Sequence, residues 1–529
     1  MEKLIVFQQE LQATKERVRD IPVAIITPPS PFLADERVFP LLGPLKVGAE
    51  LRKNGNHVEV LDLSGYSNYE DLVEDYVRNT GIQVFGITAT TPHIPNAVII
   101  RNKIKEVNPN AKVILGGPHV TLAYTALLQD QELGQERRGT HVFEQLESLF
   151  DKLVVGDGEM AIFYALDPQN NESIIDASSR QSSLFMQRGT LDDFAFPDRN
   201  LVDLESYRYH IDGHRAASLI SQLGCPFECG FCGGRNTDFL RIARSRNISK
   251  SVIVEIEEVI HMSENWEEPI RGIMFYDDEL NVSTGGLETL CGELIDLQKR
   301  LGIEMRFRGF IKAELFTPEQ ASLMAAAGFK VVLSGVESGS DEILTTIRKH
   351  TSREINSRCV SIAHYANLSF KALMSIGHPG ETQKTVKESI QWALENLKLG
   401  DDIDWTIITQ YPGTPYFDES VFIPEKNAWL YTEPKTGNKL WSRQVNFIRD
   451  AEYYKGVPGE YTAYVWTDHL SPDELVQQRD RAEEITRGAL GLPPISQLVA
   501  AAQQFEHSMG QGLPLHVLRT TNEIGRAHV

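Results

Sequence analysis

The chain has 529 residues, with 52 Lys and Arg against 73 Asp and Glu, so its formal net charge is -21. Hydrophobic residues make up 41% and charged residues 24%, values that exclude a disordered or fibrous protein. The acidic balance argues against DNA or an anionic membrane as the main partner, because both favour a basic surface. No apolar run reaches the roughly 18 residues needed to span a bilayer, and the first residues lack a signal-peptide pattern. We therefore expect a cytoplasmic protein of several domains.

Short β-branched runs alternate with helical patterns from Val23 to about Val155. Strands that are apolar on both faces and separated by helices indicate a parallel sheet covered on both sides. Residues 1–164 are therefore predicted to form a doubly wound, flavodoxin-like α/β domain. Its strands are expected at Val23–Thr27, Val58–Leu63, Val84–Thr88, Val113–Gly116 and Leu153–Val155, with helices near Leu42–Lys53, Tyr69–Arg78 and Asn96–Val107.

The expected strands of this domain end in loops of small residues, such as Pro28-Pro29-Ser30-Pro31 and Gly116-Gly117-Pro118-His119. Ligands of such sheets bind outside the carboxyl ends of the strands. Two interpretations fit these loops: plain tight turns, or a site at which a large flat ligand approaches the backbone. No GxGxxG pattern follows the first strand, which argues against a dinucleotide.

Residues 165–215 lose this periodicity and become polar, which predicts a linker and strap. A second α/β series follows from Ser218 to about Tyr416. Its six β/α units favour an open six-stranded barrel over residues 216–418, and barrel enzymes place their sites at the carboxyl ends of the strands. These strands are expected at Ser218–Leu223, Gly272–Tyr276, Met305–Phe310, Val331–Leu333, Phe370–Ile376 and Trp405–Thr409.

The pattern breaks after Phe417. Between Val421 and Leu470, ten of fifty residues are aromatic. This enrichment fits the core of a small domain, or a cap that closes the barrel over a flat or apolar substrate. We expect a mixed, partly helical C-terminal cap over residues 419–522. Residues 523–529 read as a translated sequencing adapter.

Three of the five cysteines lie within eight residues: Cys225, Cys229 and Cys232 form a Cx3Cx2C loop after the first expected barrel strand. Cys291 and Cys359 are isolated and fit core positions. Three thiolates on one loop can each bind a different iron of a 4Fe–4S cubane, which leaves the fourth iron open. The alternative, structural zinc, normally requires four ligands, and the sequence offers no second cysteine pair.

This loop, with Phe231 before its last cysteine, resembles the signature of the radical S-adenosylmethionine (SAM) superfamily. The resemblance continues through four later strand-end motifs. It implies that Asp277 and Asp278 of an Asp-Asp-Glu motif contact the SAM amino group, and that Glu337, in Gly335-Val336-Glu337-Ser338-Gly339, faces its ribose or methionyl end. The SAM-binding residues implied are Phe231, Asp277, Asp278, Glu337, Ser338 and Gly377, and the last two motifs are Gly377-His378-Pro379-Gly380-Glu381 and Pro412-Gly413-Thr414-Pro415.

The leading domain resembles the cobalamin-binding domain that precedes some radical SAM barrels. The DxHxxG motif of other cobalamin enzymes is absent, which implies a cobalt without a protein histidine on its lower face. His119 is expected as a polar residue near the corrin. The cobalamin contacts implied are Pro28, Ser30, Thr88, Thr90, Gly116, Gly117, His119, Gly156 and Glu159.

The resemblance implies a methyltransferase that methylates an unactivated carbon through a 5′-deoxyadenosyl radical and methylcobalamin, with Cys225, Cys229 and Cys232 as cluster ligands. The alternative with the same cofactors is an oxidative cyclase or ring-rearranging enzyme. An RNA methylthiotransferase fits less well, because no cysteine precedes Cys225. A non-catalytic cobalamin or redox sensor is a further alternative. The expected partners are a small-molecule or peptide substrate and an electron donor such as flavodoxin or ferredoxin.

Overall fold

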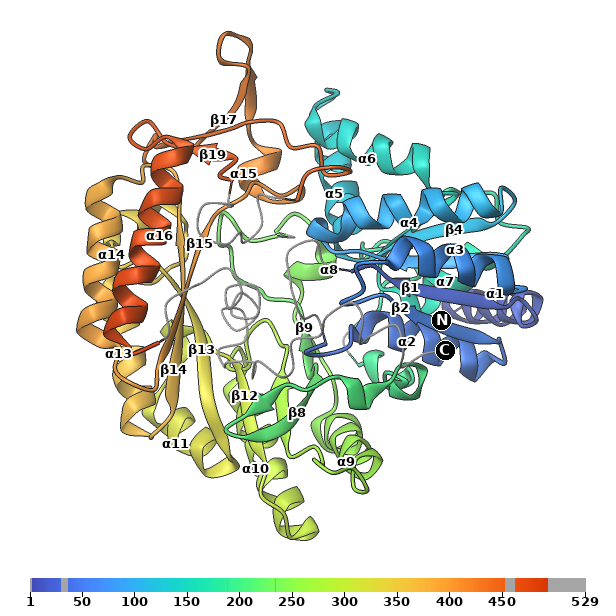
Figure 1. The fold of residues 1–529 in the computed structure, drawn as a ribbon, viewed down its shortest axis with the longest axis horizontal. Helices are drawn as coiled ribbons and strands as arrows, with labels where there is room; N and C mark the ends of the chain where they lie inside the picture. Colours follow the sequence, from blue (N-terminus) through green and yellow to red (C-terminus); the bar gives the residue numbers. More distant parts are fainter. Residues whose placement is uncertain (1, 30–36, 188, 234, 452–461, 493–529) are drawn as a thin grey trace.

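The computed structural model describes residues 2–29, 37–187, 189–233, 235–451 and 462–492. Its N-terminal part is built on a six-stranded parallel sheet in the order β2-β1-β3-β4-β5-β6 (Figure 1). The first five strands confirm the predicted ones to within one residue at each end. They are β1 (Val23–Thr27), β2 (Val58–Asp62), β3 (Val84–Thr88), β4 (Lys112–Gly116) and β5 (Lys152–Gly156), followed by β6 (Ile174–Ala177).

Helices cover both faces of this sheet, and each face has its own apolar core. In β1, Ala24 and Ile26 face one core while Val23 and Ile25 face the other. This arrangement confirms the doubly wound fold. The helices on one face are α1 (Glu2–Val18), α2 (Leu42–Asn54) and α7 (Gly158–Leu166), and those on the other are α3 (Tyr69–Asn79), α4 (Ile94–Val107), α5 (Pro118–Glu132) and α6 (Arg138–Leu149).

Strand β6 lies inside the segment that the sequence predicts as linker and strap. It pairs in parallel with β5 from Leu153 opposite Ile174 to Gly156 opposite Ala177. Only Ile175 and Ala177 of this short edge strand are buried. Two inward residues within a polar stretch are too weak a pattern to predict a strand. The strand forms because it pairs with β5, and that context is not visible in the local sequence.

The second sheet contains six parallel strands in the order β15-β14-β13-β12-β11-β8, and it confirms the predicted open barrel. Its first strand runs over His214–Leu219, four residues earlier than predicted. The difference arises because Gln222–Leu223 (β9) turns away and pairs with Arg244–Ser245 (β10). The other strands are β11 (Gly272–Phe275), β12 (Arg306–Phe310), β13 (Phe329–Glu337), β14 (Ser369–Ile376) and β15 (Asp402–Ile407), and β7 (His210–Ile211) pairs antiparallel with β8.

Helices cover the outside of this sheet, as predicted for β/α units. Alternate strand residues such as Phe307, Phe370 and Trp405 join the outer core with them. The covering helices are α9 (Ile253–Met262), α10 (Thr284–Leu301), α11 (Pro318–Ala327), α13 (Arg353–Tyr365) and α14 (Gln383–Asn396). Three short helices, α8 (Asp238–Arg241), α12 (Asp341–Thr346) and α15 (Pro415–Asp418), follow other loops of this part of the chain.

The C-terminal part is mixed, as predicted. Four antiparallel strands, β16 (Val421–Ile423), β17 (Ala428–Thr432), β18 (Lys439–Ser442) and β19 (Val465–Trp466), precede helix α16 (Pro472–Ala489), which packs beside α14 and β15 (Figure 1). Tyr431 joins the barrel core, whereas Phe447 and Tyr464 join the core of the first sheet. This segment therefore packs against both sheets. Within the described residues, every helix is too short or too polar to cross a membrane.

Candidate functional site

The cysteine loop lies at the carboxyl end of the barrel, between β9 and α8, and main-chain hydrogen bonds fix its course. Cys225 N donates to Leu240 O at 2.9 Å, and Gly230 N donates to Ile347 O at 2.9 Å. Gly224 has a φ of 80° and lies so close to the carbonyl of Ile242 that a β-carbon would clash with it. The loop is therefore pinned from two sides, and its three thiols are held on one short segment.

The three thiols suit a cluster of several irons, because thiolates spaced along one loop can each bind a separate iron. Cys225, Cys229 and Cys232 are not in disulfides. Burial raises the pKa of the Cys229 thiol, although the charges of Lys349 and Lys312 act against it. An iron ligand would stabilise the thiolate there.

The acidic motif after β11 separates into side chains with different roles. Asp277 is engaged by the loop that follows β8, since it accepts hydrogen bonds from Ser221 N at 3.0 Å and from the Ser221 hydroxyl. Asp278 is exposed. Glu279 instead has a buried Oε2 without a hydrogen-bond partner, and burial raises its pKa to about 7. Glu279 thus offers a buried acceptor atom for a new donor such as an ammonium group.

Glu337 ends β13 in an unusual conformation. Its φ is 63°, and the pairing with β14 shifts register beside it. Its carboxylate accepts from Lys349 Nζ at 2.7 Å and from Ser375 Oγ at 2.9 Å. A left-handed glutamate held by two buried partners is the kind of strained position that is common at functional sites. Lys349 lies outside every motif found in the sequence, so its contact with Glu337 could not be predicted.

His378, in the variable place of the fifth-strand turn, continues this chain of contacts. Its Nε2 lies 2.7 Å from Ser375 Oγ, and its ring packs edge-on against Phe231 with centroids 5.1 Å apart. Nδ1 is buried without a partner, and burial lowers the pKa of His378 to about 4. The expected residues Ser338 and Gly377 face elsewhere: Ser338 Oγ bonds Ser389 Oγ at 3.0 Å, and a β-carbon on Gly377 would meet Val465.

A cleft of about 1430 Å³, counting the part open to solvent, lies at the carboxyl end of the first sheet. A β-carbon on Gly86 or Gly116 would have no neighbour closer than 3.8 Å, so these glycines leave its floor open. A flat macrocycle fits such an apolar cradle better than a compact polar ligand does. Of the cobalamin contacts implied by the sequence, the cleft is lined by Thr88, Gly116, Gly117, Gly156 and Glu159.

The other implied contacts lie elsewhere. His119 is fully buried outside the lining of the cleft, where Nδ1 lies 3.1 Å from Thr91 Oγ1 and the ring packs 5.3 Å from Phe447. Thr90 contacts His93. Pro28 is buried outside the cleft lining, and Ser30 lies outside the described residues.

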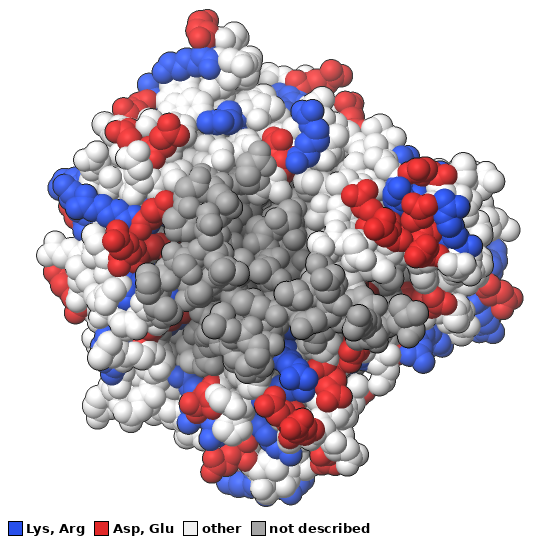
Figure 2. Space-filling model, viewed as in Figure 1, with Lys and Arg blue, Asp and Glu red and all other residues white. Residues whose placement is uncertain are grey.

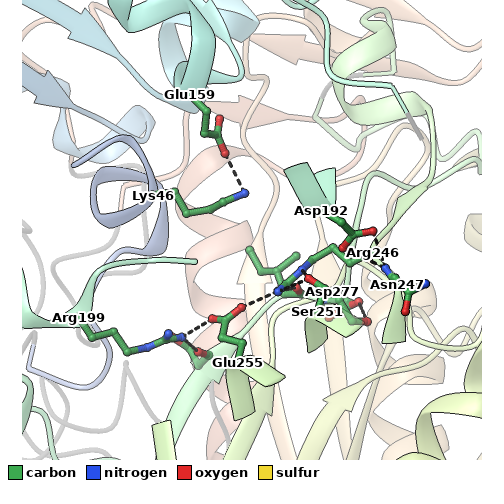
Figure 3. A network of polar contacts seen from close by, with 12 residues as sticks. Lys46, Glu159, Asp192, Arg199, Arg246, Asn247, Ser251, Glu255 and Asp277 are labelled. Carbon is green, nitrogen blue, oxygen red and sulfur yellow. Dashed lines mark hydrogen bonds and ion pairs between the residues drawn. The ribbon is translucent and has the colours of Figure 1, made fainter. Parts of the chain in front are cut away.

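Sequence reasoning missed the wall opposite the first sheet. Phe194 and Phe196 of the strap, Leu223 of β9 and Phe239 of α8 line it. Their polar support is the network in Figure 3, in which Glu255 joins Arg199 at 2.8 Å and Arg246 at 2.7 Å. On the other side of the cleft, Lys46 pairs with Glu159 at 2.8 Å. The cleft is thus completed by the barrel, and no motif in the first domain could predict that wall.

Comparisons with known proteins fit these two sites. A family model described as B12 binding domain matches residues 39–147, and one described as Radical SAM superfamily matches residues 219–393. An uncharacterized methyltransferase of Pyrococcus horikoshii is 24% identical over 416 residues, covering 75% of this chain and 83% of that protein. An anaerobic magnesium-protoporphyrin IX monomethyl ester cyclase of Rubrivivax gelatinosus is 26% identical over 396 residues, covering 69% of this chain and 64% of that protein.

Among solved structures, the radical S-adenosylmethionine methyltransferase TsrM from Kitasatospora setae, with cobalamin and a 4Fe–4S cluster bound, aligns with a TM-score of 0.63 at 17% identity. The alignment covers 96% of this chain and 98% of that chain, so the two share their fold throughout. The two family models confirm the expected cofactors, a 4Fe–4S cluster with SAM and cobalamin. The chain is therefore a cobalamin-dependent member of the radical SAM superfamily.

Proposed function

We propose that this enzyme transfers a methyl group to an unactivated carbon of its substrate. The observation that carries the proposal is the contiguity of the two sites. Gln222 and Leu223 line the cobalamin cleft, and the first cluster cysteine follows two residues later. At the far end of the cysteine loop, a β-carbon on Gly233 would contact Leu122 of α5 at 3.7 Å. A methyl donor in the cleft would therefore face the same space as SAM.

When bound, the cluster and SAM supply hydrogen abstraction and cobalamin supplies the methyl group. The chain itself holds and orients these groups. Cys225, Cys229 and Cys232 would bind the cluster, with Phe231 fixed against His378 beside it. Glu279 would accept the SAM ammonium group.

Glu337 would face the remaining part of SAM. Its place at the barrel mouth is fixed by Lys349 and Ser375. The glycine floor, with Thr88 and Glu159 at its rim, would hold the corrin. Barrel and strap form the opposite wall of the cleft, which would shield part of the bound corrin from water.

A second candidate is oxidative cyclisation without methyl transfer, as proposed from the sequence. The similarity to the Rubrivivax gelatinosus cyclase favours it, although the chain spans 64% of that protein's length. The fold supports both reactions, because the protein supplies position and the cofactors supply the chemistry.

The remaining parts of the proposal concern partners and organisation. A low-potential donor such as flavodoxin or ferredoxin would reduce the cluster in the cytoplasm. Acidic and basic side chains are interspersed on the face seen in Figure 2, which fits a small-molecule or peptide substrate better than DNA.

The domain boundaries at residues 164, 215 and 418 stay a prediction, and both family matches fall within the domains that these boundaries define.

The test is anaerobic reconstitution with iron, sulfide and hydroxocobalamin, followed by incubation with reductant, a metabolite extract and SAM whose methyl group carries deuterium. Methyl transfer yields a product that carries the label and has gained one CH2 unit. Cyclisation yields an unlabelled product that has lost hydrogens. If the reduced, reconstituted protein forms no 5′-deoxyadenosine, both candidate functions are wrong.

A further inference from the structure

The inner face of the barrel carries charges. Side chains alternate between the two faces of a strand. Phe307 of β12, Phe370 of β14 and Ile403 of β15 belong to the outer core, so their neighbours Arg308, Lys371 and Asp402 face inward. Ordinary barrel interiors are filled by branched apolar side chains. Lys371 and Asp402 pair with each other, so Arg308 is the inward charge of these three whose role needs an explanation.

Arg308 is fully buried and only partly satisfied. Its Nη1 donates to the hydroxyl of Tyr209 at 2.9 Å, whose ring packs 4.8 Å from Phe39. Within the described part of the chain, Nε and Nη2 have no hydrogen-bond partner. Burial lowers the pKa of Arg308 from its usual value. A buried guanidinium with two unused donors is costly unless an acceptor arrives.

The carboxylate whose charge acts on Arg308, that of Asp402, already has a hydrogen-bond partner. Asp402 accepts from Lys371 Nζ at 2.8 Å. Its charge influences Arg308, but no hydrogen bond joins the two. Among the described residues no acceptor pairs with the two donors, which leaves them available to a ligand.

The place of Arg308 suits a substrate that lies beneath SAM. Arg308 is in register with Met274 of β11, three residues before Asp277 of the SAM motif. Tyr276 lies between these levels, and its ring packs edge-on 5.8 Å from Phe39. A group held by Arg308 would thus sit deeper in the barrel than the motif residues.

We propose that Arg308 binds a carboxylate of the substrate inside the barrel through Nε and Nη2. This inference rests on the proposed function and names its substrate class: a molecule with an ionised carboxylate. The two free donors lie on one edge of a planar guanidinium and match the two oxygens of a carboxylate. The aromatic C-terminal segment alone favours a flat apolar substrate, so the charged interior adds a polar anchor to that expectation.

The test measures thermal unfolding of the reconstituted protein with acetate or benzoate and with the matched amides, acetamide and benzamide, at constant ionic strength. Carboxylates should raise the unfolding midpoint in a saturable way, because they bind only the folded state. Amides should not. In Arg308→Met, the apparent affinity for acetate should fall about tenfold or more. The midpoint of this variant without ligand should rise, because an unsatisfied buried charge is removed.

Tyr209→Phe is the matched control, since it removes the hydroxyl that accepts from Arg308 Nη1 but keeps the guanidinium. It should retain the carboxylate response. An equal response in Arg308→Met, an equal effect of the amides, or stronger stabilisation by inorganic phosphate would overturn the inference. SAM cleavage by the wild-type protein reports separately on the proposed function. Cleavage without a carboxylate response refutes only the subsite, and a carboxylate response without cleavage refutes only the proposed function.

Discussion

At the end of the first sheet, the cleft is lined mostly by glycines and apolar side chains such as Ile25, Ile114 and Val154, and its charged lining residues include the paired Lys46 and Glu159. At the end of the second sheet, the loops carry thiols and titratable side chains such as Glu279 and the buried Lys349. Both ends belong to parallel sheets, and both are places where such sheets bind ligands.

The difference teaches how each ligand is selected. A macrocycle that offers a broad face is held by shape, so added volume should disturb it most. A cluster and a charged sulfonium ligand are held by bonds and charges, so changes of donor or charge should disturb them most. The predictions below test this contrast.

The largest effect should follow removal of one cluster thiol at the barrel end. In Cys229→Ala, iron content should fall sharply and 5′-deoxyadenosine formation should drop to background, because two thiolates cannot hold the cubane. Iron analysis and the absorption spectrum of the anaerobic protein measure this. Cys359→Ala, at a buried cysteine in α13, is the control and should keep both. Full SAM cleavage by Cys229→Ala would contradict the assignment.

The next effect tests shape at the first sheet. Gly86→Leu places a side chain in the cleft, and we expect cobalamin affinity to fall about 10- to 100-fold, because overpacking costs about 1–3 kcal/mol. Gly86→Ala is the control, since its β-carbon would come no closer than 4.0 Å to the carbonyl of Ala24. Equilibrium titration with hydroxocobalamin measures both. Unchanged affinity in the leucine variant would place the corrin elsewhere.

A smaller effect should distinguish the acids after β11. In Glu279→Gln, SAM affinity should weaken about tenfold, since the neutral amide loses a charge-assisted contact with the ammonium group. Asp277→Asn should instead lower the unfolding midpoint and leave SAM affinity nearly unchanged, because Asp277 bonds Ser221. Calorimetric titration of SAM measures the difference. The reverse pattern would show that Asp277 contacts SAM.

The smallest effect concerns the junction between the two ends. Asp418 accepts from Asn236 Nδ2 at 2.6 Å and from Gly413 N at 3.1 Å, and burial raises its pKa to about 7. In the folded protein the Asp418 carboxyl is therefore protonated below about pH 7, whereas in the unfolded chain it is protonated only below about pH 4. The free energy of unfolding should therefore fall as pH rises from about 4 to about 7.

Asp418→Asn removes this contribution. The free energy of unfolding of the variant should therefore decline less over that range than that of the wild type, and the two slopes should differ by at most about 1.4 kcal/mol per pH unit. Denaturant titrations of both proteins at several pH values measure the slopes. Glu381 and Glu483 have similarly raised pKa values in both proteins, so only the difference between the slopes reports on Asp418. Identical slopes would mean that the Asp418 proton is not linked to folding.

Much of the fold was predictable, because strands buried on both faces leave a strong apolar pattern. The exceptions have specific causes. Strand β6 has only two buried residues, and the first barrel strand was displaced because Gln222–Leu223 pairs outside the sheet. Among the site residues, the cysteines were recognisable from their spacing, and Gly116, Gly117 and Gly156 of the cleft from the resemblance to cobalamin-binding domains. His119 was expected near the corrin but packs on Phe447, because residues close in sequence to a cleft can turn to its other side.

The sequence alone determined the order of the two sheets, the placement of three thiols on one loop and the glycines at the strand ends of the first sheet. Each of these depends on residues close along the chain. Only the tertiary structure decided that Arg246 and Glu255 of the barrel line the cleft of the first sheet, that Lys349 holds Glu337, and that two donors of Arg308 have no acceptor among the described residues. These contacts join residues distant in sequence, and their energies depend on burial that no local pattern records.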